Sequence, residues 1–204
     1  MTPTDVLAAQ SAGTLLIDTR PLAAYTAAHV PGALPVEFNL ADLAERAALL
    51  LPPGLTLVVH AEPERTIAPS CGLLEDAGFR VVGSLEGGIA AWRAEGHRTE
   101  PLPTIDVDAL RGNGAYRVLD VREPYEYRHG HLEGAVALPS GEAFARIAAS
   151  EWTPAGDGTP YAVFCSGWGR AAFVAGLLRA RDIPAVLVAG GMYAWVEHGY
   201  PVVA

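Results

Sequence analysis

The strongest constraint on the fold of this chain is an internal repeat. The segment Leu16–Arg20 (LIDTR) recurs as Val118–Arg122 (VLDVR), at an offset of 102 positions (120 − 18). Later, Gly87–Trp92 recurs as Gly190–Trp195, at an offset of 103 positions (190 − 87). A tyrosine, a histidine and a Gly-Ala pair also recur at the first offset, as Tyr25 and Tyr127, His29 and His131, and Gly32-Ala33 and Gly134-Ala135. A repeat of about 100 residues is a normal domain size, so the sequence predicts two tandem copies of one domain.

The two copies alternate between strand and helix patterns. We expect the first domain over residues 1–97, a linker that contains prolines over residues 98–103, and the second domain over residues 104–204. Short apolar runs predict strands at 14–18, 33–36, 56–60 and 81–85, and at 117–120, 135–138, 161–164 and 186–189. Helical patterns lie between them, the longer ones at 40–51, 70–77, 142–150 and 171–181, and Thr4 or Asp5 is expected to cap the first helix. This alternation predicts an α/β fold in which each domain has a parallel sheet flanked by helices on both faces.

Composition excludes several functional classes. The net charge is −9 and all 14 basic residues are arginine, which argues against nucleic acid as a partner and excludes lysine chemistry. No apolar run is long enough to span a membrane, and the N-terminus has no signal-peptide pattern, so we expect a cytoplasmic protein without a membrane partner. Two cysteines without histidines at ligand spacing predict neither a disulfide framework nor a zinc site.

One loop carries the pattern of a reactive site. The predicted strand 161–164 ends at Cys165, four residues follow (Ser166, Gly167, Trp168 and Gly169), and a helix pattern begins near Arg170. Such a loop directs backbone N–H groups inward, which would bind an anion and lower the pKa of the thiol. The two glycines are expected to permit the curled backbone, and Arg170 is expected to bind an oxyanion. The alternative is that Cys165 is a small core residue, which is the commoner role of a free cysteine.

The first copy lacks this pattern. Aligned on the following helix, Cys165 corresponds to Ala61. The matching loop contains Glu62, Pro63 and Glu64, so it has no nucleophile, carries negative charge and lacks one N–H. We therefore expect the first domain to be catalytically inactive, with Glu62 and Glu64 exposed.

Other polar and aromatic residues are assigned structural roles. We expect Cys71 to pack in the core and His29 and His131 to stabilise turns, with catalysis as the alternative for the histidines. Asp120 and Arg122 are expected to form a buried ion pair or strand-end hydrogen bonds, with lining of the active cleft as the alternative. Trp92 and Trp195 are expected in the core, and Glu142–Arg146 on a solvated helix face.

These motifs resemble those of the rhodanese (thiosulfate sulfurtransferase) family over nearly the whole chain. The matching segments are Leu119–Glu123, Tyr127–Ala135, Cys165–Arg170, and Gly190-Gly191 with Trp195. The resemblance implies two tandem rhodanese-like domains. It also implies that Cys165 carries the transferred sulfur and that residues Ser166 to Arg170 hold the substrate. Trp168 departs from the family pattern, and we expect its large apolar ring to narrow the pocket or bind the acceptor.

The resemblance also implies a reaction. A small-molecule donor such as thiosulfate would transfer its sulfane sulfur to Cys165, and the persulfide would pass it to a thiol or cyanide, without a cofactor. Mercaptopyruvate stays open as donor. An alternative is a persulfide carrier whose acceptor is a protein. A phosphatase-like hydrolase is less favoured, because the six residues from Cys165 to Arg170 are one fewer than in the related phosphatases and arsenate reductases.

Overall fold

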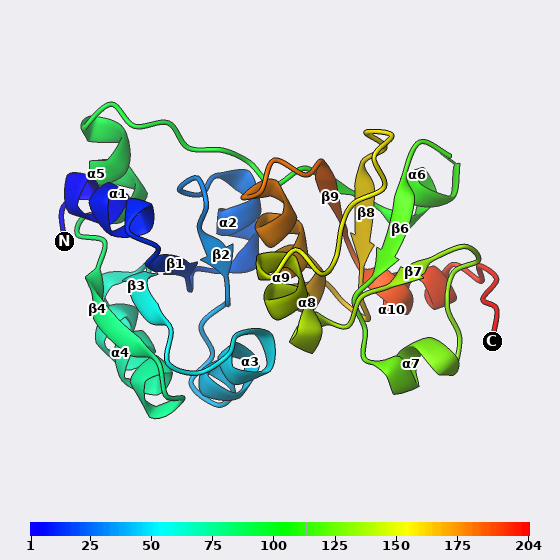
Figure 1. Ribbon diagram of the computed structural model, residues 1–204, viewed down its shortest axis with the longest axis horizontal. Helices are drawn as coiled ribbons and strands as arrows, with labels where there is room; N and C mark the ends of the chain where they lie inside the picture. Colours follow the sequence, from blue (N-terminus) through cyan, green and yellow to red (C-terminus); the bar gives the residue numbers. More distant parts are fainter. Residues whose placement is uncertain (113) are drawn as a thin grey trace. The chain divides into compact units, whose positions relative to one another are not determined.

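The computed structural model describes residues 1–112 and 114–204. The chain divides into two units, Met1–Pro101 and Leu102–Ala204, each built around its own parallel sheet (Figure 1). All pairs between the named strands are parallel, because a helix after each strand returns the chain to the end of the sheet at which that strand began.

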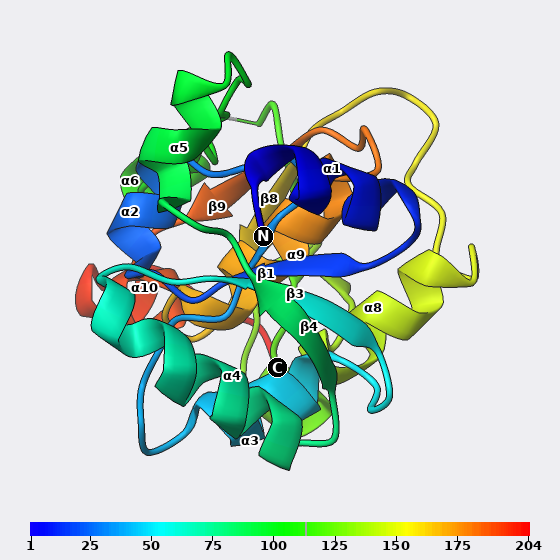
Figure 2. The same cartoon turned by 90° about the vertical axis from the view of Figure 1, so that its left-hand side faces the viewer.

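The first unit has four strands in the order β2-β1-β3-β4. Their bounds are β1 Leu15–Asp18, β2 Leu34–Pro35, β3 Thr56–His60 and β4 Arg80–Ser84. The helices are α1 Pro3–Ser11, α2 Leu22–Ala27, α3 Leu43–Leu50, α4 Ile67–Asp76 and α5 Gly88–Ala94, with a 3₁₀ turn, η1, at Glu64–Thr66. Figure 2 shows α1 and α5 on one side of these strands and α3 and α4 on the other.

The second unit has five strands in the order β5-β9-β8-β6-β7. Their bounds are β5 Thr104–Ile105, β6 Arg117–Asp120, β7 Val136–Ala137, β8 Tyr161–Phe164 and β9 Ala185–Val188. The helices are α6 Val107–Gly112, α7 Pro124–Arg128, α8 Ser140–Ala148, α9 Gly169–Arg179 and α10 Gly191–Glu197. In Figure 1, α8 and α9 cover one face of this sheet and α6 and α10 cover the other.

The central strand of the second unit is buried on both faces. Ala162 and Phe164 face a core with Trp195 of α10, and the alternate residues Tyr161 and Val163 face the opposite side. All four residues are buried, which explains why this strand is a continuous apolar run rather than an alternating one. A parallel sheet flanked by helices on both faces confirms the predicted fold class.

Most predicted elements are present, and three details differ. The first helix begins at Pro3, so its cap is Thr2 rather than Thr4 or Asp5; the Thr2 hydroxyl accepts the N–H of Asp5, and the Asp5 carboxylate accepts that of Thr2. Strand β5 has only two residues, too few to show a pattern in the sequence. Within the predicted linker, the carbonyl of Arg98 accepts a hydrogen bond from the Trp92 indole, so this segment is held against its unit.

Candidate active site

Cys165 lies directly after β8, the strand between β6 and β9 in the second sheet. Helix α10 fixes the loop that follows it. The N–H of Met192 donates to the carbonyl of Cys165 at 2.8 Å, and the N–H of Tyr193 donates to that of Ser166 at 3.0 Å. Because these contacts turn the loop carbonyls toward α10, the backbone N–H groups of the loop point to its inner side.

The glycine that this arrangement requires is Gly191, not the two glycines of the loop. Gly191 has φ +53°, and a Cβ there would lie 2.2 Å from the carbonyl oxygen of Cys165 and 2.5 Å from that of Gly167. Gly167 and Gly169 have no left-handed φ, and a Cβ on either would meet nothing within 4 Å. The expectation that these two glycines permit the curled backbone was therefore wrong. Glycine is required at position 191 instead, because the loop approaches the backbone of α10 too closely for a Cβ.

The thiol of Cys165 is buried, with 2% of the residue exposed. Burial raises its pKa above the ordinary value of 9.0, because a thiolate loses hydration there. Hydrogen bonds from the backbone of Ala171 and Gly167 and the charge of Arg170 act in the opposite direction. The sequence-based expectation of a lowered pKa is thus reversed. The predicted stabilising groups are present, but desolvation outweighs them.

Arg170 forms an ion pair with Glu126 of α7. The two guanidinium nitrogens Nη1 and Nη2 donate to Oε2 and Oε1 of Glu126 at 2.5 and 2.8 Å. The hydroxyl of Ser166 also donates to Glu126 Oε1, at 2.6 Å, and accepts from Arg170 Nη2 at 3.1 Å. These contacts hold the pKa of Glu126 at about 2 and raise that of Arg170, so both side chains are charged at neutral pH.

Sequence reasoning missed Glu126. The repeat contains a signal for it. The first copy has Ala24 at the matching position, 102 residues earlier, just as it has Ala61 where the second copy has Cys165. Arg170 likewise corresponds to Thr66 at the loop offset of 104 (170 − 66). The cysteine, the arginine and the glutamate are therefore all present in the second copy and all replaced in the first.

The remaining loop side chain is Trp168, which is 49% exposed. It does not pack into the core, so its ring is available to a molecule that approaches the loop. The structure therefore brings all six predicted site residues, Cys165 to Arg170, into one short segment between β8 and the first turn of α9.

The residues at the end of β6 are structural, as the sequence predicts. Arg122 and Asp120 form a buried ion pair of 2.6 Å, and Arg122 also donates to the carbonyl of Gly130. His131 stacks on Tyr127 and its Nδ1 contacts the Tyr127 carbonyl. Asp18, Arg20, Tyr25 and His29 repeat the ion pair and the stacking in the first unit.

Three further expectations can be compared with the structure. Trp92 and Trp195 are buried, as predicted. The Glu142–Arg146 pair lies on the exposed face of α8, also as predicted. Cys71 is only partly buried, so the prediction of a core position holds only in part.

At the corresponding site of the first unit, the Glu62 side chain contacts the start of α5. Ala61 follows β3 as Cys165 follows β8. Oε1 of the Glu62 carboxylate accepts the N–H of Ile89 at 3.1 Å and contacts His60 Nε2 at 3.2 Å. Glu62 is exposed, as predicted, with 45% of its side chain accessible, and its carboxylate forms these two contacts as well. Glu64 is exposed, as predicted.

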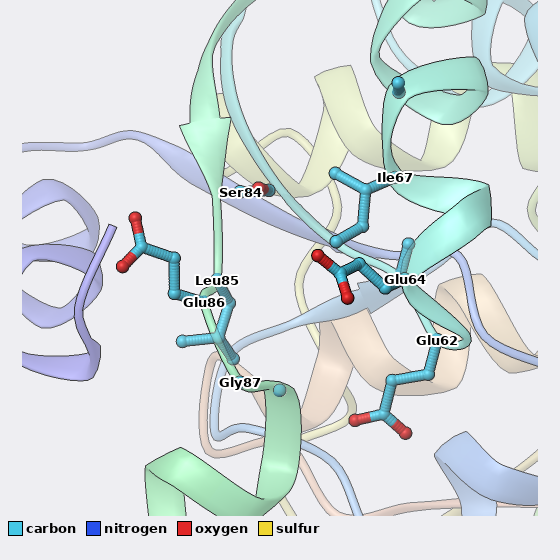
Figure 3. A pocket seen from close by; sticks show the side chains of 10 residues that line it. Glu62, Glu64, Ile67, Ser84, Leu85, Glu86 and Gly87 are labelled. Carbon is cyan, nitrogen blue, oxygen red and sulfur yellow. The ribbon is translucent and has the colours of Figure 1, made fainter.

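A pocket opens beside this loop. Figure 3 shows Glu62, Glu64 and Ile67 on one side of it and Leu85 on the other, with the Glu86 carboxylate directed away. Glu86 instead binds the N-terminal ammonium group at 2.8 Å.

Over residues 1–112 and 114–204, no three His, Cys, Asp or Glu side chains are grouped closely enough to hold a metal ion. In the same ranges, no helix has the length and apolar character needed to cross a membrane.

Comparison with known proteins gives the family of the chain. The family described as "Rhodanese-like domain" matches residues 2–95 and again residues 105–198. No curated protein matches the sequence.

Several solved structures are similar in part. A thiosulfate sulfurtransferase from Pseudomonas aeruginosa is 22% identical with a TM-score of 0.43, over 100% of this chain and 43% of that one. A rhodanese-related protein from Thermoplasma volcanium is 33% identical with a TM-score of 0.44, over 50% of this chain and 97% of that one. A probable thiosulfate sulfurtransferase is 21% identical with a TM-score of 0.46, over 94% and 97% of the two chains. This chain thus spans less than half of the Pseudomonas aeruginosa protein.

The two family matches coincide with the two repeats and with the two sheets that the structure shows. The chain therefore belongs to the rhodanese family and contains two rhodanese-like domains.

Proposed function

We propose that this protein is a sulfurtransferase in which Cys165 carries sulfane sulfur from thiosulfate or a similar donor to a thiol or cyanide. One observation carries the proposal. The Cys165 thiol lies at the carboxyl end of β8, inside a loop whose backbone hydrogen bonds, from Gly167 and Ala171, favour a negative charge on its sulfur. The first unit has no nucleophile at this position, so we assign it no catalytic role.

The transfer proceeds in two steps. The Cys165 thiolate attacks the sulfane sulfur of the donor, the donor's S–S bond breaks, and its electron pair leaves with the remainder, which is sulfite when the donor is thiosulfate. The perthiolate formed is itself an anion, so the same backbone N–H groups stabilise it until an acceptor thiolate or cyanide removes the outer sulfur.

The test compares the protein with its Cys165→Ser variant. Both are mixed with thiosulfate, and the intact mass is measured before cyanide is added and thiocyanate after. We expect one extra sulfur and thiocyanate from the wild-type protein alone. If the folded wild-type protein, with its thiol reduced, gains no sulfur from thiosulfate or from methanethiosulfonate, the proposal fails.

A second outcome would favour a different role. If Cys165 gains the sulfur but returns it to cyanide and small thiols very slowly, a protein acceptor becomes the better assignment. The half-exposed ring of Trp168 would then be the first residue to examine as a contact for that acceptor.

A further inference from the structure

We propose that Glu126 is a positioning residue that sets the charge preference of the Cys165 loop for its sulfur donor: by pairing with Arg170 and Ser166 it makes a donor with at most one negative charge load Cys165 faster than the dianion thiosulfate does. This inference rests on the proposed function, because it concerns the donor of that reaction. Neither Glu126 nor its charge follows from the motif Cys165–Arg170 itself.

Arg170, the cation of the loop, is paired with Glu126. The pair is bidentate, with N–O distances of 2.5 and 2.8 Å, and the side chains are only 23% and 16% exposed. A bidentate arginine–carboxylate pair of this kind holds both orientation and charge. Ser166, the first residue after the cysteine, also directs its hydroxyl to Glu126 at 2.6 Å. The loop's charged side chain and its hydroxyl are therefore both turned to a carboxylate of the protein.

The charges of the donor make this arrangement selective. Thiosulfate is a dianion, and it must approach a thiolate. The negative charge of Glu126 cancels the positive charge of Arg170, so no net cation lies beside the thiolate. The thiolate therefore repels an approaching dianion, and no nearby positive charge offsets this repulsion. A monoanionic or neutral donor meets much less repulsion. Such donors include a thiosulfonate, R–SO₂–S⁻, and a hydropersulfide, R–S–SH.

The reaction with a hydropersulfide is balanced without any further reagent. The Cys165 thiolate bonds to the terminal sulfur of R–S–SH, the S–S bond of the donor breaks, and R–S⁻ leaves with the electron pair. The products are Cys165 persulfide and one thiolate, and the backbone N–H groups of the loop suffice for the single negative charge.

The experiment uses two donors that differ mainly in charge. Thiosulfate and methanethiosulfonate both present a sulfane sulfur on a sulfonyl group, as a dianion and a monoanion. The rate constant for sulfur loading of Cys165 is measured with each donor by intact mass, and their ratio is compared between wild-type protein and Glu126→Gln. The glutamine keeps the shape and a hydrogen-bond acceptor but removes the charge.

We expect Glu126→Gln to raise the thiosulfate-to-methanethiosulfonate ratio by about tenfold, because it removes the carboxylate that is paired with Arg170 in a partly buried site. Higher ionic strength should also raise thiosulfate loading in the wild-type protein, because salt screens the repulsion, and less so in the variant. A variant that merely loosened the loop would slow both donors equally and leave the ratio unchanged.

Two variants serve as controls. Glu142→Gln removes a glutamate from an exposed Glu–Arg pair of the same unit and should leave the ratio as it is. Glu126→Asp keeps the charge and should keep the ratio of the wild-type protein even if both rates fall. If Glu126→Gln does not fold, Glu126→Ala, which also removes the charge, takes its place in the same comparison of ratios.

The other outcomes separate the two proposals. An unchanged ratio in Glu126→Gln, or thiosulfate loading that falls with salt in the wild-type protein, overturns the role of Glu126 and leaves the sulfurtransferase assignment intact. Failure of both donors to load the folded, reduced wild-type protein overturns the proposed function itself, and this inference with it.

Discussion

The carboxylate of Glu62 accepts a hydrogen bond from the backbone N–H of Ile89 at 3.1 Å. In the second unit the matching N–H, that of Met192, donates to the carbonyl of Cys165. The same backbone N–H, near the start of the last helix of each unit, therefore has two different acceptors. In the second unit it binds a loop carbonyl, and in the first unit it binds a side-chain carboxylate. The first loop has therefore lost its anion-binding form as well as its nucleophile.

The first prediction follows from this difference. In a Cys165→Ser background, Ala61→Cys should not restore sulfur loading, because the Glu62 carboxylate lies in the loop, Pro63 has no N–H and Thr66 stands where Arg170 would be. Thiosulfate or methanethiosulfonate is added, and peptide mass mapping distinguishes the introduced thiol from Cys71. Loading at a rate within about tenfold of that of Cys165 would contradict this account of the first loop.

The second prediction compares two glycines with nearly the same backbone conformation. Gly191 and Gly88 have φ +53° and +54°, but a Cβ would meet the Cys165 carbonyl oxygen at 2.2 Å in one case and the flexible Glu62 side chain at 2.1 Å in the other. Gly191→Ala should slow sulfur loading of Cys165 by about 100-fold, since a displaced loop misplaces the reacting sulfur. Gly88→Ala should leave that rate unchanged. Equal effects of the two variants on the loading rate would contradict this prediction.

The third prediction concerns pH. Burial raises the pKa of Cys165, so less thiolate is present at neutral pH than in a free thiol, and the thiolate fraction grows as pH rises toward that pKa. The loading rate with excess methanethiosulfonate should therefore rise about tenfold per pH unit between pH 6 and pH 8. Stopped-flow or quenched-flow mass measurement gives the profile. A rate that is already constant at neutral pH would mean that the backbone N–H groups and Arg170 outweigh desolvation.

The fourth prediction concerns stability. Asp120→Asn removes the carboxylate from a fully buried ion pair and leaves the Arg122 guanidinium without its partner, which should lower the free energy of unfolding of the second unit by about 3 kcal/mol. Hydrogen exchange followed by mass spectrometry reports the amides of β6 separately from those of the first unit. The matched control is Asp157→Asn, in which the lost pair with Arg117 is exposed. The control should change stability little, because solvent screens such pairs; equal losses in both variants would contradict the prediction.

The sequence by itself determined the tandem organisation, the fold class and the position of the cysteine. Local patterns suffice for these. The central strands, Thr56–His60 and Tyr161–Phe164, are predicted with their observed bounds because continuous apolar runs mark strands buried on both faces. The repeat added independent support, since the Asp-Arg and Tyr-His pairs recur and form the same contacts in both units.

Only the tertiary structure decided the electrostatics of the site. Glu126 and Arg170 are 44 positions apart in the sequence (170 − 126), and no local pattern indicates that α7 places a carboxylate on the loop after β8. The direction of the pKa shift of Cys165 is also a balance between desolvation and nearby donors, which depends on how deeply the sheet buries the sulfur. The glycine that the loop needs lies in α10 for the same reason: close approach of two backbones is a property of packing, not of the segment that it constrains.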